Sequence, residues 1–151
     1  MEQTLFIRPY RPDDEQAVIT LWLRCHLITS SNNPHEDIAR KLKVHPELFF
    51  IGLLDQKLVA TCMAGYEGHR GWINYLAVDP EYQHQGIARR IMETAEKALY
   101  TIGCPKINLQ VRSTNAAVIA VYEKLGFTKD NVVSMGKRLV RDHPCHLRKN
   151  S

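Results

Sequence analysis

Apolar residues recur along the chain with two periods, and each period predicts a different kind of element. Short runs of alternating or continuous apolar residues, bounded by Pro, Gly or Asp, are typical of strands. The strands expected on this basis are residues 4–11, 48–54, 57–63, 72–78, 106–111 and 127–135, with room for an extension of the last one to Leu139. Only Asp55-Gln56 separates the second run from the third, which predicts a tight β-hairpin.

Apolar residues spaced three and four positions apart predict four helices between these strands. The expected helices are residues 14–27, 34–44, 86–102 and 115–125, and Asp13 can cap the first of them. Their apolar stripes are Ala17, Val18, Leu21 and Cys25 in the first helix and Ile87, Ile91, Ala95 and Leu99 in the third. The order β-α-α-β-β-β-α-β-α-β predicts an α/β protein with a mixed sheet and helices packed on its faces.

The composition is that of one ordinary globular domain. The chain has 151 residues, of which 44% are hydrophobic and 24% are charged. No apolar run approaches the ~20 residues of a membrane-spanning helix. The first residues lack the basic-then-apolar pattern of a secretory signal. The four cysteines are scattered without metal-ligand spacing, which predicts a reducing, cytoplasmic location.

The formal net charge is +4, and much of the positive charge lies near the C-terminus. Residues 1–140 are therefore predicted to be the folded domain and 141–151 a basic, flexible tail. The same charges could instead attract an acidic partner or phosphates. No aromatic residue is interleaved with them, so nucleic-acid binding gains little support. The residues concerned are Lys137, Arg138, Arg141, His143, His146, Arg148 and Lys149.

The strongest chemical signal is a polar turn between an expected strand and an expected helix, within residues 76–90. A helix that begins in such a turn directs unpaired backbone N–H groups and its positive dipole end at one point, which suits a phosphate. Gly86 has no Cβ and lets an anion approach the backbone, and Gln83 and Gln85 can donate hydrogen bonds. An ordinary strand–turn–helix junction would have the same local pattern.

Two motifs resemble the signatures of the GNAT superfamily of N-acetyltransferases. The turn has the form Gln-x-x-Gly-x-Ala, which resembles the family's acyl-CoA pyrophosphate loop. Residues 115–127 begin with Asn and end in Tyr-Glu-Lys-Leu-Gly-Phe, which is similar to the second signature. The resemblance covers residues 4–139 and implies the GNAT fold, a mostly antiparallel sheet that splays between its fourth and fifth strands, with helices on both faces. Residues 65–71 and 134–139 also resemble the YpeA subgroup.

The resemblance implies acetyl-CoA as co-substrate and no metal. In this family the pantetheine arm lies between the strands that correspond to residues 72–78 and 106–111, bonding the backbone near Leu76 and Val78. Unpaired edge amides can accept such a ligand. Asn115 would orient the pantetheine, although a plain helix N-cap would have the same sequence. The cofactor-binding residues implied are Leu76, Ala77, Val78, Gln83, His84, Gln85, Gly86, Ile87, Ala88, Arg89 and Asn115.

Tyr122 is the catalytic residue that the resemblance implies most directly. It would act as general acid and protonate the departing CoA thiolate. A free phenol titrates at about 10 and a thiol at about 8.5, so the phenol proton is available at neutral pH. Taken without its motif, Tyr122 would be interpreted as a tyrosine packed against the sheet.

The general base is less defined. The ribosomal-protein N-terminal acetylating branch of the family has a glutamate where this chain has Gln110, and an amide cannot accept a proton near neutral pH. Glu67 or His69 could take the proton of the amine through a water, since an imidazole exchanges protons near neutral pH. The alternative is a solvated loop without a catalytic role. Tyr75 could orient that water or simply pack.

The sequence therefore predicts an N-acetyltransferase in which a primary amine of a small molecule or peptide attacks acetyl-CoA directly. The Ser/Asn-rich residues 27–35 are expected to cover the acceptor. The predicted partners are acetyl-CoA and the amine, without nucleic acid or membrane, and a homodimer is left open. Two alternatives remain, namely protein N-terminal acetylation, against which Gln110 counts, and an acyl-CoA sensor without turnover.

Overall fold

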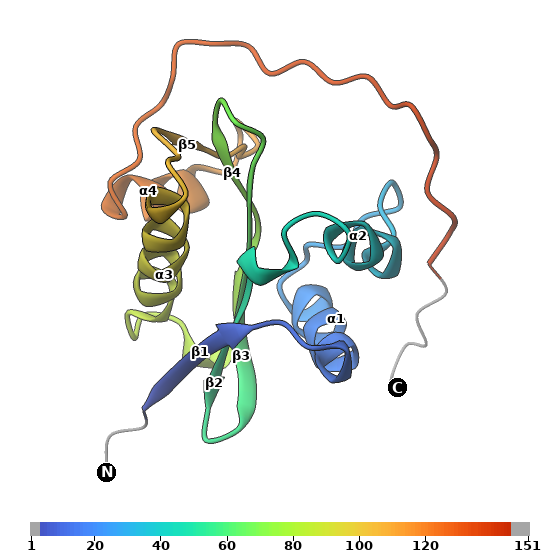
Figure 1. Cartoon of the computed structure of the whole chain (residues 1–151), viewed down its shortest axis with the longest axis vertical. Coiled ribbons are helices and arrows are strands. Elements are labelled where there is room, and N and C mark those ends of the chain that lie inside the picture. The colour runs from blue at the N-terminus through green and yellow to red at the C-terminus, as the bar shows by residue number, and fades with distance from the viewer. Residues whose placement is uncertain (1–3, 146–151) are drawn as a thin grey trace.

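The computed structural model describes residues 4–145 as a five-stranded sheet covered by helices (Figure 1). The strands follow one another across the sheet in chain order. The first four pair antiparallel, and the fifth pairs with the fourth in parallel, which confirms the predicted mixed sheet. The strands are β1 (Leu5–Pro9), β2 (Phe49–Leu54), β3 (Lys57–Tyr66), β4 (Gly71–Val78) and β5 (Ile107–Asn108).

Helices cover both faces of this sheet, as the sequence predicts (Figure 1). On one face α1 (Glu15–Arg24) and α2 (Pro34–Lys41) bury a core that includes Trp22. On the other face lie α3 (Ile87–Thr101) and α4 (Ala116–Lys124). Short 3-10 turns at Pro12–Asp14, Pro46–Leu48 and Pro80–Tyr82 precede α1, β2 and the turn into α3.

The predicted apolar stripe agrees with the buried residues in α3, but only partly in α1. All four stripe residues of α3 are buried, from Ile87 to Leu99. In α1 the buried side includes Ile19 and Trp22, whereas Ala17 is exposed, so the predicted stripe was partly wrong. Asp13 is not the cap either, because α1 begins one residue later, at Glu15, with Asp14 as its N-cap.

β4 and β5 meet at one end only. Within the described residues, Gly71 pairs with Ile107 and Trp72 pairs with Asn108, and the ladder stops there. A Cβ at Gly71 would lie 2.6 Å from the sulfur of Cys104, so glycine allows this close approach. The predicted splay is confirmed, and the predicted strand 106–111 is shortened to two residues. From Ile73 onward, no strand of residues 4–145 lies beside β4 on the β5 side.

The predicted last strand, 127–135 or 127–139, was wrong, because residues 128–145 form neither helix nor strand. Val132, Val133 and Met135 are apolar enough for a strand, yet they are 78%, 85% and 90% exposed. A strand needs a neighbour for its backbone groups. β5 ends at Asn108 and gives this segment no ladder to join.

The chain after α4 instead runs as an extended segment to α2 on the far side (Figure 1). The carboxylate of Asp142 lies 2.6 Å from the Arg40 guanidinium and accepts the Asn33 N–H at 3.1 Å. The His143 N–H donates to Glu36 at 3.2 Å. The described part of the predicted tail is therefore attached to α2. His146, Arg148 and Lys149 lie outside the described residues.

Candidate active site

The turn before α3 contains backbone in the left-handed region. His84 and Gly86 have φ of 63° and 78°, and Gly86 is the N-cap of α3. Such conformations make a concavity of backbone N–H groups that can take an anion. A Cβ added to Gly86 would meet no atom within 4 Å, and the first turn of α3 has no acidic side chain. The turn therefore fits a diphosphate at a helix N-terminus.

The side chains around this turn are partly held by other elements. Gln83 Nε2 donates to the Val78 carbonyl at 3.4 Å, so this side chain joins the turn to the last residue of β4. Arg89 Nη2 donates to the Lys124 carbonyl at 2.8 Å, at the C-terminal end of α4. Arg89 therefore joins α3 to α4 and satisfies a carbonyl that the helix leaves free.

The remaining expected cofactor residues divide between core and surface. Ala77 and Ile87 are buried, Ala88 is half-buried, and His84 and Gln85 are exposed. Asn115 is exposed, and its Oδ1 accepts the N–H of Val118 at 3.3 Å. This contact is that of a helix N-cap, the alternative that the sequence left open for Asn115.

β4 contains a bulge on the stretch that has no β5 beside it. Two residues, Tyr75 and Leu76, lie opposite the single residue Cys62 of β3. Tyr75 has a φ of 51°, a left-handed value that non-glycine residues rarely adopt. A bulge leaves its extra residue out of the ladder and re-aims the groups around it. This feature has no counterpart in the sequence prediction.

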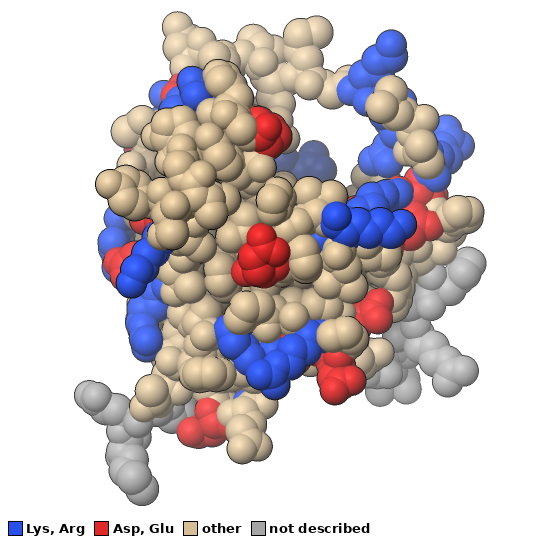
Figure 2. Space-filling view, in the orientation of Figure 1, with Lys and Arg blue, Asp and Glu red and all other residues tan. Residues whose placement is uncertain are grey.

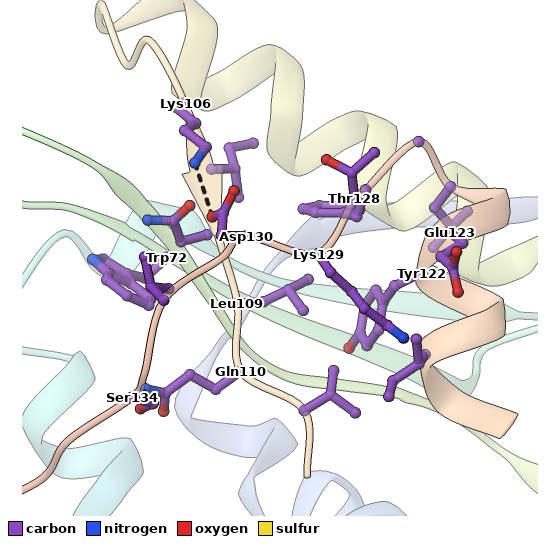
Figure 3. A pocket seen from close by; sticks show the side chains of 18 of the residues that line it. Trp72, Lys106, Leu109, Gln110, Tyr122, Glu123, Thr128, Lys129, Asp130 and Ser134 are labelled. Carbon is purple, nitrogen blue, oxygen red and sulfur yellow. Dashed lines mark hydrogen bonds and ion pairs between the residues drawn. The ribbon is translucent and has the colours of Figure 1, made fainter. Parts of the chain in front are cut away.

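Tyr122 projects from α4 toward the sheet (Figure 3). Its ring packs edge-to-face on Phe127 with centroids 5.8 Å apart, and it contacts the core beneath α3. Burial, together with the nearby thiol of Cys62, raises the pKa of Tyr122 to about 12. Cys62 lies opposite the bulge and belongs to the core cluster on which both Leu76 and Tyr122 pack.

A hollow of about 990 Å³ opens between β5, α4 and the chain that follows α4 (Figure 3). Leu109, Ile119 and Phe127 contribute apolar lining, and Tyr122 contributes its phenol. An ion pair between Lys106 and Asp130 at 2.9 Å and a hydrogen bond from Gln110 to Ser134 join its two sides. Ligand pockets commonly have volumes of about 300–1,000 Å³, so the hollow can take a substrate.

Glu67 and His69 lie in the loop between β3 and β4, before Gly71. The Glu67 carboxylate accepts the N–H groups of His69 at 3.0 Å and of Arg70 at 2.5 Å. These two bonds lower its pKa. The strand from Gly71 to Tyr75 spans about 13 Å. The two predicted bases therefore lie before the start of β4, away from the bulge at Tyr75.

Tyr75 connects the bulge to the segment between α1 and α2. Its hydroxyl donates to Asp37 at 2.5 Å and accepts from the Asn32 amide at 2.5 Å. Its ring stacks on Trp22 with centroids 3.8 Å apart and planes 12° apart. The ring of Tyr75 thus packs on α1, while its hydroxyl is bonded to Asn32 and Asp37. Asn32 lies in the segment 27–35 that was expected to cover the acceptor, but the sequence gives no signal that Asn32 and Asp37 meet Tyr75, because local spacing cannot pair residues so far apart.

Charges of both signs are interspersed on the face of the molecule shown in Figure 2. No stripe of one sign crosses this face, and an acidic side chain lies near its centre. Within residues 4–145, no helix is long and apolar enough to cross a membrane. In the same part of the chain, no three potential metal ligands gather at one point. All four cysteines are free thiols.

Comparisons with known proteins agree with this geometry. Residues 15–127 match the family model described as the Acetyltransferase (GNAT) family. An acetyltransferase of Sodalis glossinidius is 48% identical over 137 residues, which cover 90% of this chain and 96% of that protein.

Two solved structures show the same fold. The ribosomal-protein-S18-alanine N-acetyltransferase of Escherichia coli matches with a TM-score of 0.70 and 26% identity, over 84% of this chain and 79% of that one. The PaiA N-acetyltransferase of Thermoplasma acidophilum, solved with coenzyme A, matches with a TM-score of 0.67 and 20% identity, over 86% and 93% of the two chains. The fold and the site thus define an acetyltransferase. The chain belongs to the GNAT acetyltransferase family.

Proposed function

We propose that this acetyltransferase transfers the acetyl group of acetyl-CoA to a primary amine by direct attack. One observation carries the proposal, namely that three features lie together beside the splayed strands. These are the β4 edge without β5, the bulge at Tyr75 and Leu76, and the protonated phenol of Tyr122. Acetyl-CoA supplies an activated thioester, and the residues of the chain have only to bind it, polarise its carbonyl and stabilise the departing sulfur.

The proposed acetyl-CoA site runs along the free edge of β4 to the turn before α3. Backbone groups of Leu76 and Val78 are proposed to pair with the amides of the pantetheine, as an added strand would. The diphosphate would take the backbone N–H groups from Gln83 to Gly86, and the space beside Gly86 is open, because an added Cβ there would meet no atom within 4 Å. The PaiA enzyme, which has the same fold, was solved in complex with coenzyme A, and this supports coenzyme A as the kind of ligand.

Tyr122 is proposed to serve the leaving sulfur chiefly as a hydrogen-bond donor. Its pKa of about 12 keeps the phenol protonated at every physiological pH. A thiol titrates at about 8.5, so the equilibrium favours a thiolate beside a neutral phenol over a thiol beside a tyrosinate. Hydrogen bonds to a charged acceptor are stronger than neutral ones, and this one forms only as charge develops on sulfur.

For the base, His69 is a better proposal than Glu67. The Glu67 carboxylate is held by two backbone N–H groups that lower its pKa and weaken it as a base. His69 lies in the same loop, more than about 10 Å along β4 from the bulge. A proton would therefore have to pass from the amine to His69 through water.

The acceptor is proposed to enter beside the bulge, where Tyr75 meets Asn32 of the segment between α1 and α2 and Asp37 of α2. Gln110 donates a hydrogen bond to Ser134, so it has a structural partner and no basic function. This favours a small amine, or a peptide bound differently, over the mechanism of the ribosomal-protein branch.

The test is release of free thiol from acetyl-CoA in the presence of a panel of small amines and peptides with free N-termini. Acetylated product, identified by mass spectrometry, and one free thiol per product are expected for at least one acceptor. Tight binding of CoA without turnover of any acceptor would instead make the protein an acyl-CoA sensor. Absence of CoA binding would refute both functions.

A further inference from the structure

A buried chain of hydrogen bonds connects α1 to the β4 bulge. Trp22 Nε1 donates to the Thr61 hydroxyl at 2.9 Å, and that hydroxyl donates to the Tyr75 carbonyl at 2.8 Å. Trp22 and Thr61 are fully buried. An indole N–H can only donate, and a carbonyl can only accept. The direction of both bonds is therefore fixed, and the Thr61 hydroxyl is the one group that can join them.

The geometry of the peptide unit carries this constraint to the other side of β4. The Tyr75 carbonyl and the Leu76 N–H belong to one planar trans peptide unit, so they point in opposite directions. Thr61, on β3, holds the carbonyl toward β3 and α1. The Leu76 N–H is thereby directed away from β3, toward the edge of β4 that is not paired with β5.

We infer that Thr61 is a positioning residue for acetyl transfer, which sets the direction of the Leu76 N–H that polarises the thioester carbonyl. The inference rests on the proposed function. Thr61 touches no substrate and acts only through the peptide unit between Tyr75 and Leu76. The φ of 51° at Tyr75 supports the inference, because a strained conformation persists only where several contacts hold it. The stack of Tyr75 on Trp22 is a second such contact.

The experiment measures the carbonyl stretch of acetyl-CoA labelled with carbon-13 in its acetyl group, free and bound, by difference infrared spectroscopy. A hydrogen bond from the Leu76 N–H should lower the stretching frequency in the wild-type complex. Thr61→Val removes the hydroxyl at nearly constant volume and should abolish at least half of that shift. Thr61→Ser keeps the hydroxyl and should retain it. Affinity for CoA, which has no acetyl group, should change less than twofold in both variants.

Thr20→Val is the matched control, because Thr20 is exposed and its hydroxyl bonds only within α1. A wild-type shift that survives in Thr61→Val would overturn the inference while leaving the proposed function intact. Failure of the wild-type protein to bind acetyl-CoA would overturn both. Should Thr61→Val not fold, Thr61→Ala removes the hydroxyl and leaves no donor in its place, and a full wild-type shift in that variant would equally refute the inference.

Discussion

Replacing Tyr122 by Phe removes one oxygen atom and leaves the ring in place. The ring packs edge-to-face on Phe127 and against the core beneath α3, and phenylalanine can keep both contacts. What the variant loses is the proton that the phenol offers to the departing sulfur. The substitution therefore separates the proposed chemical role of Tyr122 from its packing role.

The size of the effect follows from the kind of hydrogen bond that is lost. A hydrogen bond to a charged group contributes about 1.5–3 kcal/mol, which corresponds to a fall in rate of about 10- to 150-fold. The sulfur carries charge only as the thioester breaks, so the loss should appear in turnover. Affinity for acetyl-CoA should change less than about twofold, because an uncharged thioester sulfur is a weak acceptor.

The assay is steady-state thiol release with the best acceptor from the amine panel, together with calorimetric titration of acetyl-CoA in the absence of acceptor. Tyr100→Phe is the matched control, since Tyr100 lies on α3 and is 81% exposed. The pH profile gives a second readout. A pKa of about 12 predicts no loss of wild-type turnover from ionisation of Tyr122 below about pH 11. Turnover of Tyr122→Phe equal to that of the control would exclude the phenol from the mechanism.

Three further predictions concern other parts of the site. Gly86→Val should weaken CoA binding at least tenfold by calorimetry, because a branched residue is strained at a φ of 78° and projects into the space proposed for the diphosphate; unchanged affinity would place the diphosphate elsewhere. Tyr75→Phe removes the hydroxyl that bonds Asn32 and Asp37 and should raise the KM of the acceptor several-fold at constant KM for acetyl-CoA; an effect on acetyl-CoA alone would contradict the proposed entry of the acceptor. The Arg40 partner lowers the pKa of Asp142 from 3.8 to about 2, so the stabilisation by this contact is complete above pH 3.8 and is lost as the pH falls through 2. Asp142→Asn should remove this part of an acid-unfolding curve, and an identical curve would show that the contact contributes nothing.

The third helix and the last predicted strand show how far periodicity can predict this fold. The α3 stripe from Ile87 to Leu99 is buried throughout, because an amphipathic helix has one apolar face to place on a core. The apolar run that contains Val132 and Val133 gives an equally clear local signal, yet it forms no strand. A strand depends on a neighbour, and the splay that ends β5 at Asn108 removes the neighbour. Local patterns therefore predict helices better than edge strands here.

The same distinction, between local patterns and contacts distant in sequence, separates the parts of the candidate site that could be predicted from those that could not. The turn into α3 could be predicted, because its glycine, its polar residues and the helix that follows are adjacent in sequence. The bulge could not, because tyrosine favours regular strands and is not among the residues that favour a left-handed backbone. Its conformation is held by Thr61 of β3 and, through Thr61, by Trp22 of α1. Substitutions in the core beneath α1 should therefore alter chemistry at the β4 edge without touching the ligand, as long as they change the hydrogen bond that orients the Tyr75 peptide.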